Sequence, residues 1–134
     1  MLVLDDALLG DYLDGTPGAR TFLETYEEEV WAVPVPVLYG ACMASLHGHI
    51  DGSPGTVRRA VTMSMDVLDV TGRTVAEAVD LQAELLERGV PAAPPDVLVA
   101  ASAREHGGTL ETAEEHFRQE EVGEVLSVAT YEPY

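Results

Sequence analysis

Residues 94–117 read PPDVLVAASAREHGGTLETAEEHF, and this stretch decides the fold expected for the chain. The two opening prolines suit the first turn of a helix, where a missing N–H breaks no hydrogen bond. The residues from Val97 to Ala103 are apolar on nearly every side, which predicts a helix buried on most of its surface. Gly107-Gly108 is typical of a helix end, and Thr109–Thr112 has the composition of a short strand. The stretch therefore predicts a buried helix that leads directly into a strand.

Two acidic residues of this stretch fall where ligand sites form. Asp96 lies in the first turn of the predicted helix, where the helix dipole favours a carboxylate. Glu114 lies just beyond the carboxyl end of the predicted strand, which is where open α/β sheets place their ligand sites. We therefore expect a helix start and a strand end to present Asp96 and Glu114 to a common point.

Short apolar runs and helix signals alternate along the rest of the chain. Strands are predicted at Leu2–Leu4, Val30–Val33, Met65–Val70, Thr109–Thr112 and Val122–Thr130. Helices are predicted after Asp5, after Thr16-Pro17, over Val35–Leu46, after Ser53-Pro54, from a capping box at Thr74–Glu77 to Gly89, and after Pro94. This alternation predicts an α/β protein with a mostly parallel central sheet and helices on both faces, a three-layer α/β/α sandwich. We expect a single domain over residues 1–134.

The charge balance restricts the possible partners. The net charge is −17, from 24 acidic residues against seven arginines and no lysine. A chain this acidic repels nucleic acid at low salt. Two interpretations stay open: a protein without a nucleic-acid function, or one adapted to multimolar salt, where the Debye length is about 3 Å. The absence of lysine and the spread of acids along the chain favour the second, a protein of a halophilic microbe.

The absence of lysine also excludes several catalytic classes. A P-loop needs a phosphate-binding Lys and a Gly-rich spacing that the chain lacks. Asp5-Asp6 after a strand is similar to phospho-acceptor folds such as response-regulator receivers, but those rely on a Lys near the phosphoryl group. Schiff-base catalysis requires a Lys as well.

One uncharged stretch, Val30–Ile50, is long enough to span a bilayer, for which about 20 apolar residues are needed. Pro34, Pro36 and Gly40 interrupt it, and a buried strand followed by a core helix explains it better. The amino terminus lacks the basic region of a signal peptide, and the single Cys42 allows no internal disulfide. We therefore expect no membrane segment and a cytoplasmic, reducing location.

Three carboxylates fall at one edge of the predicted sheet. Asp5 follows the first strand, Asp96 starts the helix before the fourth strand, and Glu114 follows the fourth strand. Converging carboxylates repel one another, and Mg²⁺ or Mn²⁺ held by their oxygens relieves the repulsion and activates water for attack on a phosphodiester. A structural interpretation stands beside this one, in which the residues are a helix cap, a dipole partner and a solvated loop charge. The case for a site therefore rests on the three residues together.

Three motifs of the chain resemble those of the PIN-domain family, and more narrowly the VapC-type toxin ribonucleases. Leu4–Leu13 is similar to the first motif, in which an Asp closes the first strand before a helix. Pro95–Ala103 resembles the third motif, whose Asp is a metal ligand. Leu110–Phe117 resembles the fourth motif, a Thr, one residue, an Asp, and a Phe three further on. The resemblance covers most of the chain, and the third and fourth motifs together are fairly specific.

Several positions depart from the family pattern. Gly40 best matches a Glu that the family has in the helix after the second strand, and no acid replaces it between residues 30 and 50. Asp6 and Ala7 stand where small polar residues usually follow the first Asp, and His116 stands where a second acid is often found. Either a metal site of weaker affinity, with Asp6 or a water in compensation, or a lost site is therefore expected.

The resemblance implies the toxin of a type II toxin–antitoxin system, a metal-dependent endoribonuclease. Asp5 and Asp96 carry over as ligands of Mg²⁺ or Mn²⁺, and Glu114 carries over as a substitute for the family's Asp. It also implies an RNA substrate, a VapB-like antitoxin partner and a homodimer. The alternative is a catalytically degenerate PIN fold that serves as a binding or assembly module, which Gly40, Ala7 and His116 favour. A small acidic α/β protein unrelated to RNA is a third hypothesis.

Overall fold

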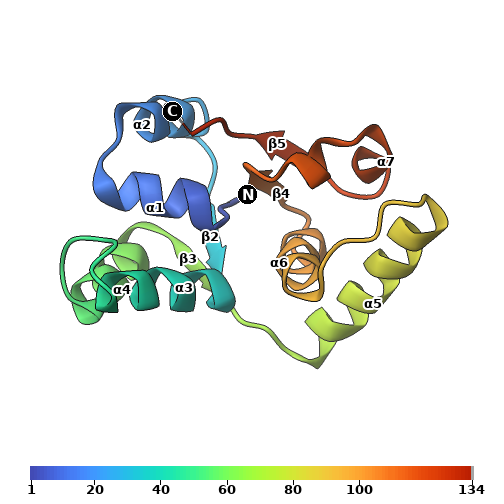
Figure 1. The fold of residues 1–134 in the computed structure, drawn as a ribbon, viewed down its shortest axis with the longest axis horizontal. Coiled ribbons are helices and arrows are strands. Elements are labelled where there is room, and N and C mark those ends of the chain that lie inside the picture. Colours follow the sequence, from blue (N-terminus) through green and yellow to red (C-terminus); the bar gives the residue numbers. More distant parts are fainter. Residues whose placement is uncertain (134) are drawn as a thin grey trace.

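Five parallel strands form the sheet at the centre of residues 1–133, the part of the chain that the computed structural model describes (Figure 1). They are β1 (Leu2–Val3), β2 (Trp31–Pro34), β3 (Asp66–Leu68), β4 (Thr109–Thr112) and β5 (Val128–Thr130), in the spatial order β3-β2-β1-β4-β5. Leu2 of β1 lies opposite Trp31 on one side and Thr109 on the other. The predicted parallel sheet is confirmed, and β1 and β4, which lead to Asp5 and Glu114, are neighbours in it.

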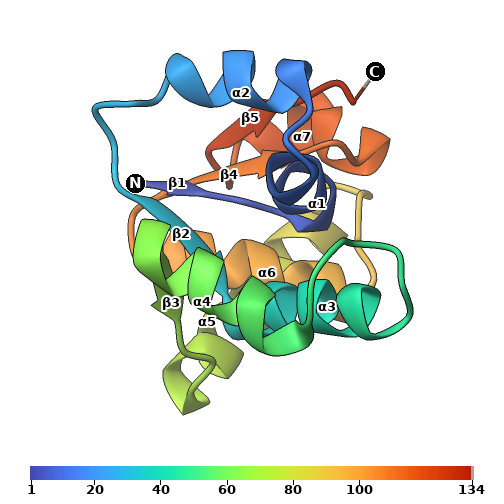
Figure 2. The ribbon, with the colours of Figure 1, turned by 90° about the vertical axis from the view of Figure 1, so that its left-hand side faces the viewer.

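Helices cover both faces of this sheet. They are α1 (Asp6–Asp14), α2 (Pro17–Glu24), α3 (Val35–Leu46), α4 (Pro54–Ser64), α5 (Gly72–Glu87), α6 (Pro94–Glu105) and α7 (Glu120–Gly123), with a 3-10 turn η1 (Glu115–Arg118) after β4. Because successive strand residues point to opposite faces, Leu2 and Leu4 pack with α1 to α4, whereas Val3 packs with α5, α6 and α7. On the first face, α3 and α4 lie side by side (Figure 2). The predicted three-layer α/β/α sandwich is confirmed.

The uncharged stretch Val30–Ile50 forms β2 and α3, the strand and core helix that the sequence predicts. Val33, Val37 and Ala41 from this stretch are buried in the core beneath α1. Across residues 1–133, no helix combines the length and the apolar character that crossing a membrane requires.

The start of α5 lies earlier than its predicted capping box. The box begins at Thr71, not Thr74: the Thr71 hydroxyl accepts from the N–H of Arg73, and the Thr74 hydroxyl accepts from the N–H of Thr71. Thr74 is fully buried and donates to Glu105 Oε2 at 2.7 Å, so it also ties α5 to the end of α6. The prediction placed the cap at the wrong one of two threonines that are three residues apart.

The predicted strand Val122–Thr130 is wrong over its first half. Val122 lies in α7, and the N–H of Leu126 donates to the carbonyl of Val122 at 3.0 Å. Both side chains are buried in the core against α6, because a spacing of four residues brings them to one side of a helical turn. Only residues 128–130 pair with β4.

Helix α5 has apolar residues on two sides. Those on one side are exposed: Val75, Val79, Ala83 and Leu86. Leu81 and Leu85, from another side of the helix, are fully buried and pack in the core with α6. A helix with apolar residues on two sides needs its neighbours to decide which side faces inward.

Candidate functional site

A pocket of about 410 Å³ opens beyond the carboxyl ends of β1 and β4. Five acidic side chains line it: Asp5, Asp6, Asp96, Glu114 and Glu115. The other lining residues are apolar or hydroxylic, and no Arg or His of the described chain is among them. The structure thus brings together the three carboxylates predicted from the sequence and adds two more.

Asp5 reaches this pocket from the junction of β1 and α1. Its Oδ1 accepts a hydrogen bond from the N–H of Leu8 at 3.2 Å, which caps α1. Its Oδ2 accepts from the N–H of Ala113 at 3.0 Å, just after β4. The interpretation of Asp5 as a helix cap is confirmed, and the second bond ties the same carboxylate to the segment that carries Glu114.

Asp96 and Glu114 come from two further elements. Asp96 lies in the first turn of α6, directly after the two prolines that open the helix. Glu114 lies between β4 and η1 with its side chain exposed, and its backbone N–H donates to the hydroxyl of buried Thr112 at 3.0 Å. The backbone at the end of β4 is thereby fixed, while the Glu114 carboxylate remains free to adjust to a ligand.

Asp6 lies directly after Asp5, as the first residue of α1. Its side chain reaches solvent, yet partial burial raises its pKa above the ordinary value, and the charges of Asp5, Asp96 and Glu114 raise it further. Four carboxylates from three parts of the chain therefore act on one another in this pocket. A bound cation would lower the free energy of this arrangement.

Helix α3 contributes no acid to the pocket. Its buried Val37 lines the pocket beside Asp6, and Gly40 lies about one turn further along the helix. A Cβ atom added to Gly40 would lie 3.3 Å from Asp6 Oδ1. The Asp6 carboxylate therefore occupies space that a side chain at position 40 would contest.

The donor set can be tested against a divalent metal ion. Carboxylate oxygens are the ligands that Mg²⁺ and Mn²⁺ prefer, so the lining of this pocket fits such an ion in donor type and in charge. Within residues 1–133, no three His, Cys, Asp or Glu side chains are already gathered as a ligand set. Binding would therefore have to draw the carboxylates together.

The histidines of the chain lie elsewhere. His47 and His49 are exposed at and just beyond the end of α3. His116 lies in η1, where its Nε2 is 3.1 Å from the carbonyl oxygen of Val90. His116 thus packs against the loop before α6 and does not line the acidic pocket.

Glu111, a buried carboxyl group next to Asp5, is not among the site residues predicted from the sequence. Glu111 of β4 is fully buried on the opposite face from Leu110, and its Oε1 accepts from the N–H of Asp5 at 3.2 Å. Its Oε2 has no hydrogen-bond partner within residues 1–133. Burial, and then the charge of Asp5, raises the pKa of Glu111 to about 9. The available signal was an acid in the middle of a four-residue strand, where a buried side chain is expected.

A second buried contact joins α1 to the segment after β5. The hydroxyl of Tyr131 donates to Asp11 Oδ2 at 2.6 Å. Burial, and then the hydrogen bond to Asp11, raises the pKa of Tyr131 to about 12. The sequence offered no interpretation of Tyr131–Tyr134, of which residue 134 lies outside the described residues.

The fold and the pocket define a class: a parallel α/β/α protein with an acidic site at the carboxyl edge of its sheet. The PIN domain family matches residues 2–121, and the chain belongs to this family. No curated protein sequence matches it.

Solved structures of similar fold extend over most of the chain. VapBC2 from Rickettsia felis, bound to a DNA fragment from its promoter, is 16% identical over 98% of both chains, with a TM-score of 0.76. A toxin–antitoxin complex from Klebsiella pneumoniae is 18% identical over 97% of both chains, with a TM-score of 0.78. VapC20 from Mycobacterium tuberculosis, a toxin that cleaves the sarcin–ricin loop, is 14% identical over 82% of this chain and 87% of that one, with a TM-score of 0.61. At these identities the likeness concerns the fold.

Proposed function

We propose that this PIN-domain protein is the toxin of a type II toxin–antitoxin system and hydrolyses RNA with the help of a divalent metal ion. The observation that carries the proposal is that one pocket is lined by Asp5, Asp96 and Glu114. Within residues 1–133, no basic residue lines this pocket. Membership of the PIN family and the similar fold of known toxin complexes support it. These three residues are the proposed ligands of Mg²⁺ or Mn²⁺, and the bound ion would supply an activated water for attack on the phosphodiester.

The charge of the chain sets the conditions for this reaction. RNA must approach a protein of net charge −17 at a pocket lined by five acids. A bound divalent cation reduces the local repulsion, and about 1 M salt shortens the Debye length to about 3 Å, which removes most of the long-range repulsion. We therefore propose that the protein works in a cytoplasm of high salt, as in a halophilic microbe.

The proposed partners follow from the same comparisons. Two of the similar structures are VapBC2 with promoter DNA and a toxin–antitoxin complex, so a VapB-like antitoxin is the proposed protein partner. A homodimer is proposed for the toxin itself. Light scattering in concentrated KCl tests the dimer, because a monomer and a dimer of a 14.4 kDa chain differ twofold in mass.

The nuclease is tested by RNA cleavage in concentrated KCl with Mn²⁺ or Mg²⁺. We expect the wild type to cut, chelation to stop the reaction, and Asp96→Ala to reduce the rate by at least about 100-fold, because a ligand charge is lost. Asp80→Ala, which removes an exposed acid of α5, a helix that contributes no residue to the pocket, is the matched control and should keep the wild-type rate. Cleavage that survives both chelation and Asp96→Ala would exclude this site as the nuclease centre.

A catalytically degenerate PIN fold is the second candidate, and a specific observation favours it. Helix α3 lines the acidic pocket with Val37 and the adjoining pocket with Gly40, neither of which offers a carboxylate. If the wild type does not cut RNA while Gly40→Glu or Val37→Glu does, the scaffold is intact and the native protein is a binding or assembly module. Both positions are included because Val37 lines the acidic pocket itself, whereas Gly40 lines the adjoining one.

A further inference from the structure

Asp6 and Gly40 are 34 residues apart in sequence and adjacent in space. Asp6 is the first residue of α1, and Gly40 lies in the middle of α3. A Cβ on Gly40 would lie 3.3 Å from Asp6 Oδ1, closer than ordinary van der Waals contact. Even an alanine at position 40 would therefore press on the Asp6 carboxylate in its present position.

The pockets on either side of this contact share Asp6. It lines the acidic pocket together with Asp5, Asp96 and Glu114. It also lines the adjoining pocket between α1 and α3 together with Gly40. The Asp6 carboxylate thus lies on the α3 side of the acid group, the side to which α3 itself brings no charge.

We infer that Asp6 is a further ligand of the metal ion, reaching from α1 over a space that Gly40 of α3 leaves open. The inference rests on the function proposed above, since it adds a residue to the same site. It gives one physical account of two residues that otherwise have no connection: a second acid directly after Asp5, and a glycine inside a core helix, where glycine costs about 1 kcal/mol relative to alanine. A larger residue at position 40 would crowd the carboxylate, since even its Cβ would lie 3.3 Å from Asp6 Oδ1.

Mn²⁺ binding measured by electron paramagnetic resonance tests the inference without any need for RNA cleavage. We expect the wild type to bind one Mn²⁺ in concentrated KCl and Asp6→Asn to weaken that binding at least about tenfold. Asp96→Asn should weaken it as well, which shows that the ion occupies this pocket. Asp80→Asn on α5 should leave it unchanged.

Gly40→Ala separates a ligand from a neighbouring charge. Its added Cβ removes no charge and crowds only Asp6 Oδ1, so we expect weaker Mn²⁺ binding in this variant. Gly10→Ala is the matched control, because Gly10 also lies inside a helix and a Cβ there meets nothing within 4 Å. Urea unfolding of each variant without metal confirms that the fold is retained.

The outcomes distinguish the inference from the function on which it rests. If Asp96→Asn weakens Mn²⁺ binding but Asp6→Asn and Gly40→Ala do not, the metal site stands and the role of Asp6 is overturned. If the wild type binds no Mn²⁺, both the metal-dependent function and the inference are overturned. Weakening by Asp6→Asn together with unchanged binding by Gly40→Ala would overturn the part of the inference that assigns Gly40 the space for the Asp6 carboxylate.

Discussion

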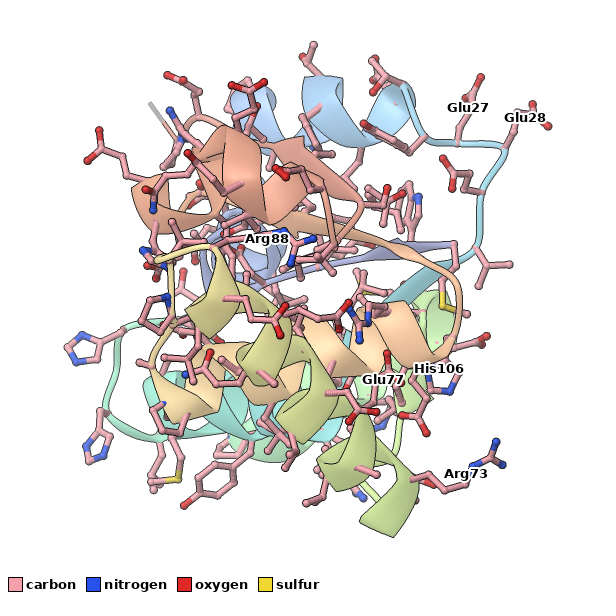
Figure 3. The ribbon with its side chains drawn as sticks, turned by 90° about the vertical axis from the view of Figure 1, so that its right-hand side faces the viewer. Glu27, Glu28, Arg73, Glu77, Arg88 and His106 are labelled. Atoms are coloured by element: carbon pink, nitrogen blue, oxygen red, sulfur yellow. The ribbon has the colours of Figure 1, made fainter. Side chains whose placement is uncertain are left out.

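Acidic side chains gather near both ends of helix α6, but the two groups of charges are balanced in different ways. At its carboxyl end, Arg104 donates to Glu84 at 2.7 Å and to Glu77, both on α5. Figure 3 shows Glu77 on this face of the molecule, where α5 lies over α6. At its amino end, Asp96 shares a pocket with four other acids, and no arginine of the described chain lines it. The chain has seven arginines and 24 acidic residues, and Arg104 is the arginine that lies where α5 and α6 pack.

The comparison teaches where the chain tolerates unbalanced charge. Partial burial lowers the pKa of Arg104, but its hydrogen bonds to Glu84 and Glu77 outweigh burial and leave the pKa above its ordinary value. Those acids are neutralised by the protein itself as it folds. Burial, and then the charges of Asp5, Asp96 and Glu114, raise the pKa of Asp6 instead, and no arginine of the described chain lines the pocket to balance these acids. A charged side chain with an ionic partner inside the protein stabilises the packing of the two helices. A charged side chain without such a partner is available to bind a ligand.

Glu111 differs from both groups of acids, because its carboxyl group holds a proton instead of pairing with a cation. Its pKa of about 9 lies above the ordinary 4.5, so between these pH values the folded protein holds a proton that the unfolded chain has released. The free energy of unfolding therefore falls as pH rises from about 5 to 9, by at most about 1.4 kcal/mol per pH unit. Glu111→Gln retains an oxygen that can accept from the N–H of Asp5 and cannot titrate, so we expect it to remove most of this slope.

Urea unfolding at several pH values in constant KCl measures this effect. Exposed Glu121→Gln is the matched control and should keep the wild-type pH dependence. Equal slopes for the wild type and Glu111→Gln would mean that Glu111 is ionised in the folded state, and that a buried cation or water balances it.

Arg104→Met breaks the balanced end of α6. Glu77 and Glu84 would keep their charges beside each other without a partner, and the bond from Arg104 to the carbonyl of Val125 would be lost. The two acids are 29% and 41% exposed, so water recovers part of the loss and we expect a cost of about 2 kcal/mol rather than the larger cost of a fully buried pair. Urea unfolding in low and high KCl should show the greater loss at low salt.

Arg73→Met provides the control for this prediction. The Arg73 side chain is exposed and points away from the molecule (Figure 3), so its removal should change the free energy of unfolding by less than about 0.5 kcal/mol. If both variants lose the same stability, the effect comes from net charge and not from the pairing at the end of α6.

Much of the fold could be predicted because its signals are local. The bounds of α3 and β4 match the predicted Val35–Leu46 and Thr109–Thr112, since prolines, glycines and short apolar runs mark these elements within the sequence itself. Asp5, Asp96 and Glu114 meet because parallel strands end at one edge, which is a property of the topology. Over a few residues, a helix and a strand can have the same pattern of apolar residues. The strand predicted at Val122 is therefore wrong: Val122 lies in a helical turn and is buried against α6.

The rest of the site depends on contacts between distant parts of the chain. The approach of Asp6 to Gly40 joins α1 and α3, and the sequence shows only the two residue types. The burial of Glu111 depends on what covers the other face of β4, and neither Leu110 nor Thr112 beside it reveals that cover. Whether an acidic side chain is exposed or buried thus depends on the tertiary structure, even where its strand is predicted correctly.

Tyr131→Phe tests an acid whose partner is a hydroxyl. The variant removes the hydrogen bond to Asp11 Oδ2 and keeps the ring, which packs edge-on against Phe22 at 5.3 Å between centroids. We expect a loss of about 1 kcal/mol, because Asp11 is partly exposed and water replaces the lost donor. Tyr39→Phe, at a position that is 65% exposed, should lose almost nothing in the same urea titration. A loss near 3 kcal/mol would place Asp11 in the buried group with Glu111.

Glu114→Gln tests the unbalanced end of α6 and has the smallest expected effect. Removing this exposed charge lessens the repulsion among the pocket acids, so the variant should be more stable than the wild type by a few tenths of a kcal/mol, about the size of an exposed pair interaction. The gain should be visible in urea at low salt without divalent ions and should shrink as KCl screens the charges. Added Mn²⁺ should then reverse the order, because the wild type gains stability by binding the ion and the variant gains less.

The same change at the paired end acts in the opposite direction, since Glu84→Gln weakens a bond to Arg104. If Glu114→Gln and Glu84→Gln change the free energy of unfolding in the same direction, the charges at the two ends of α6 are balanced in the same way. The pocket would then have no greater tendency to bind a cation than the paired end.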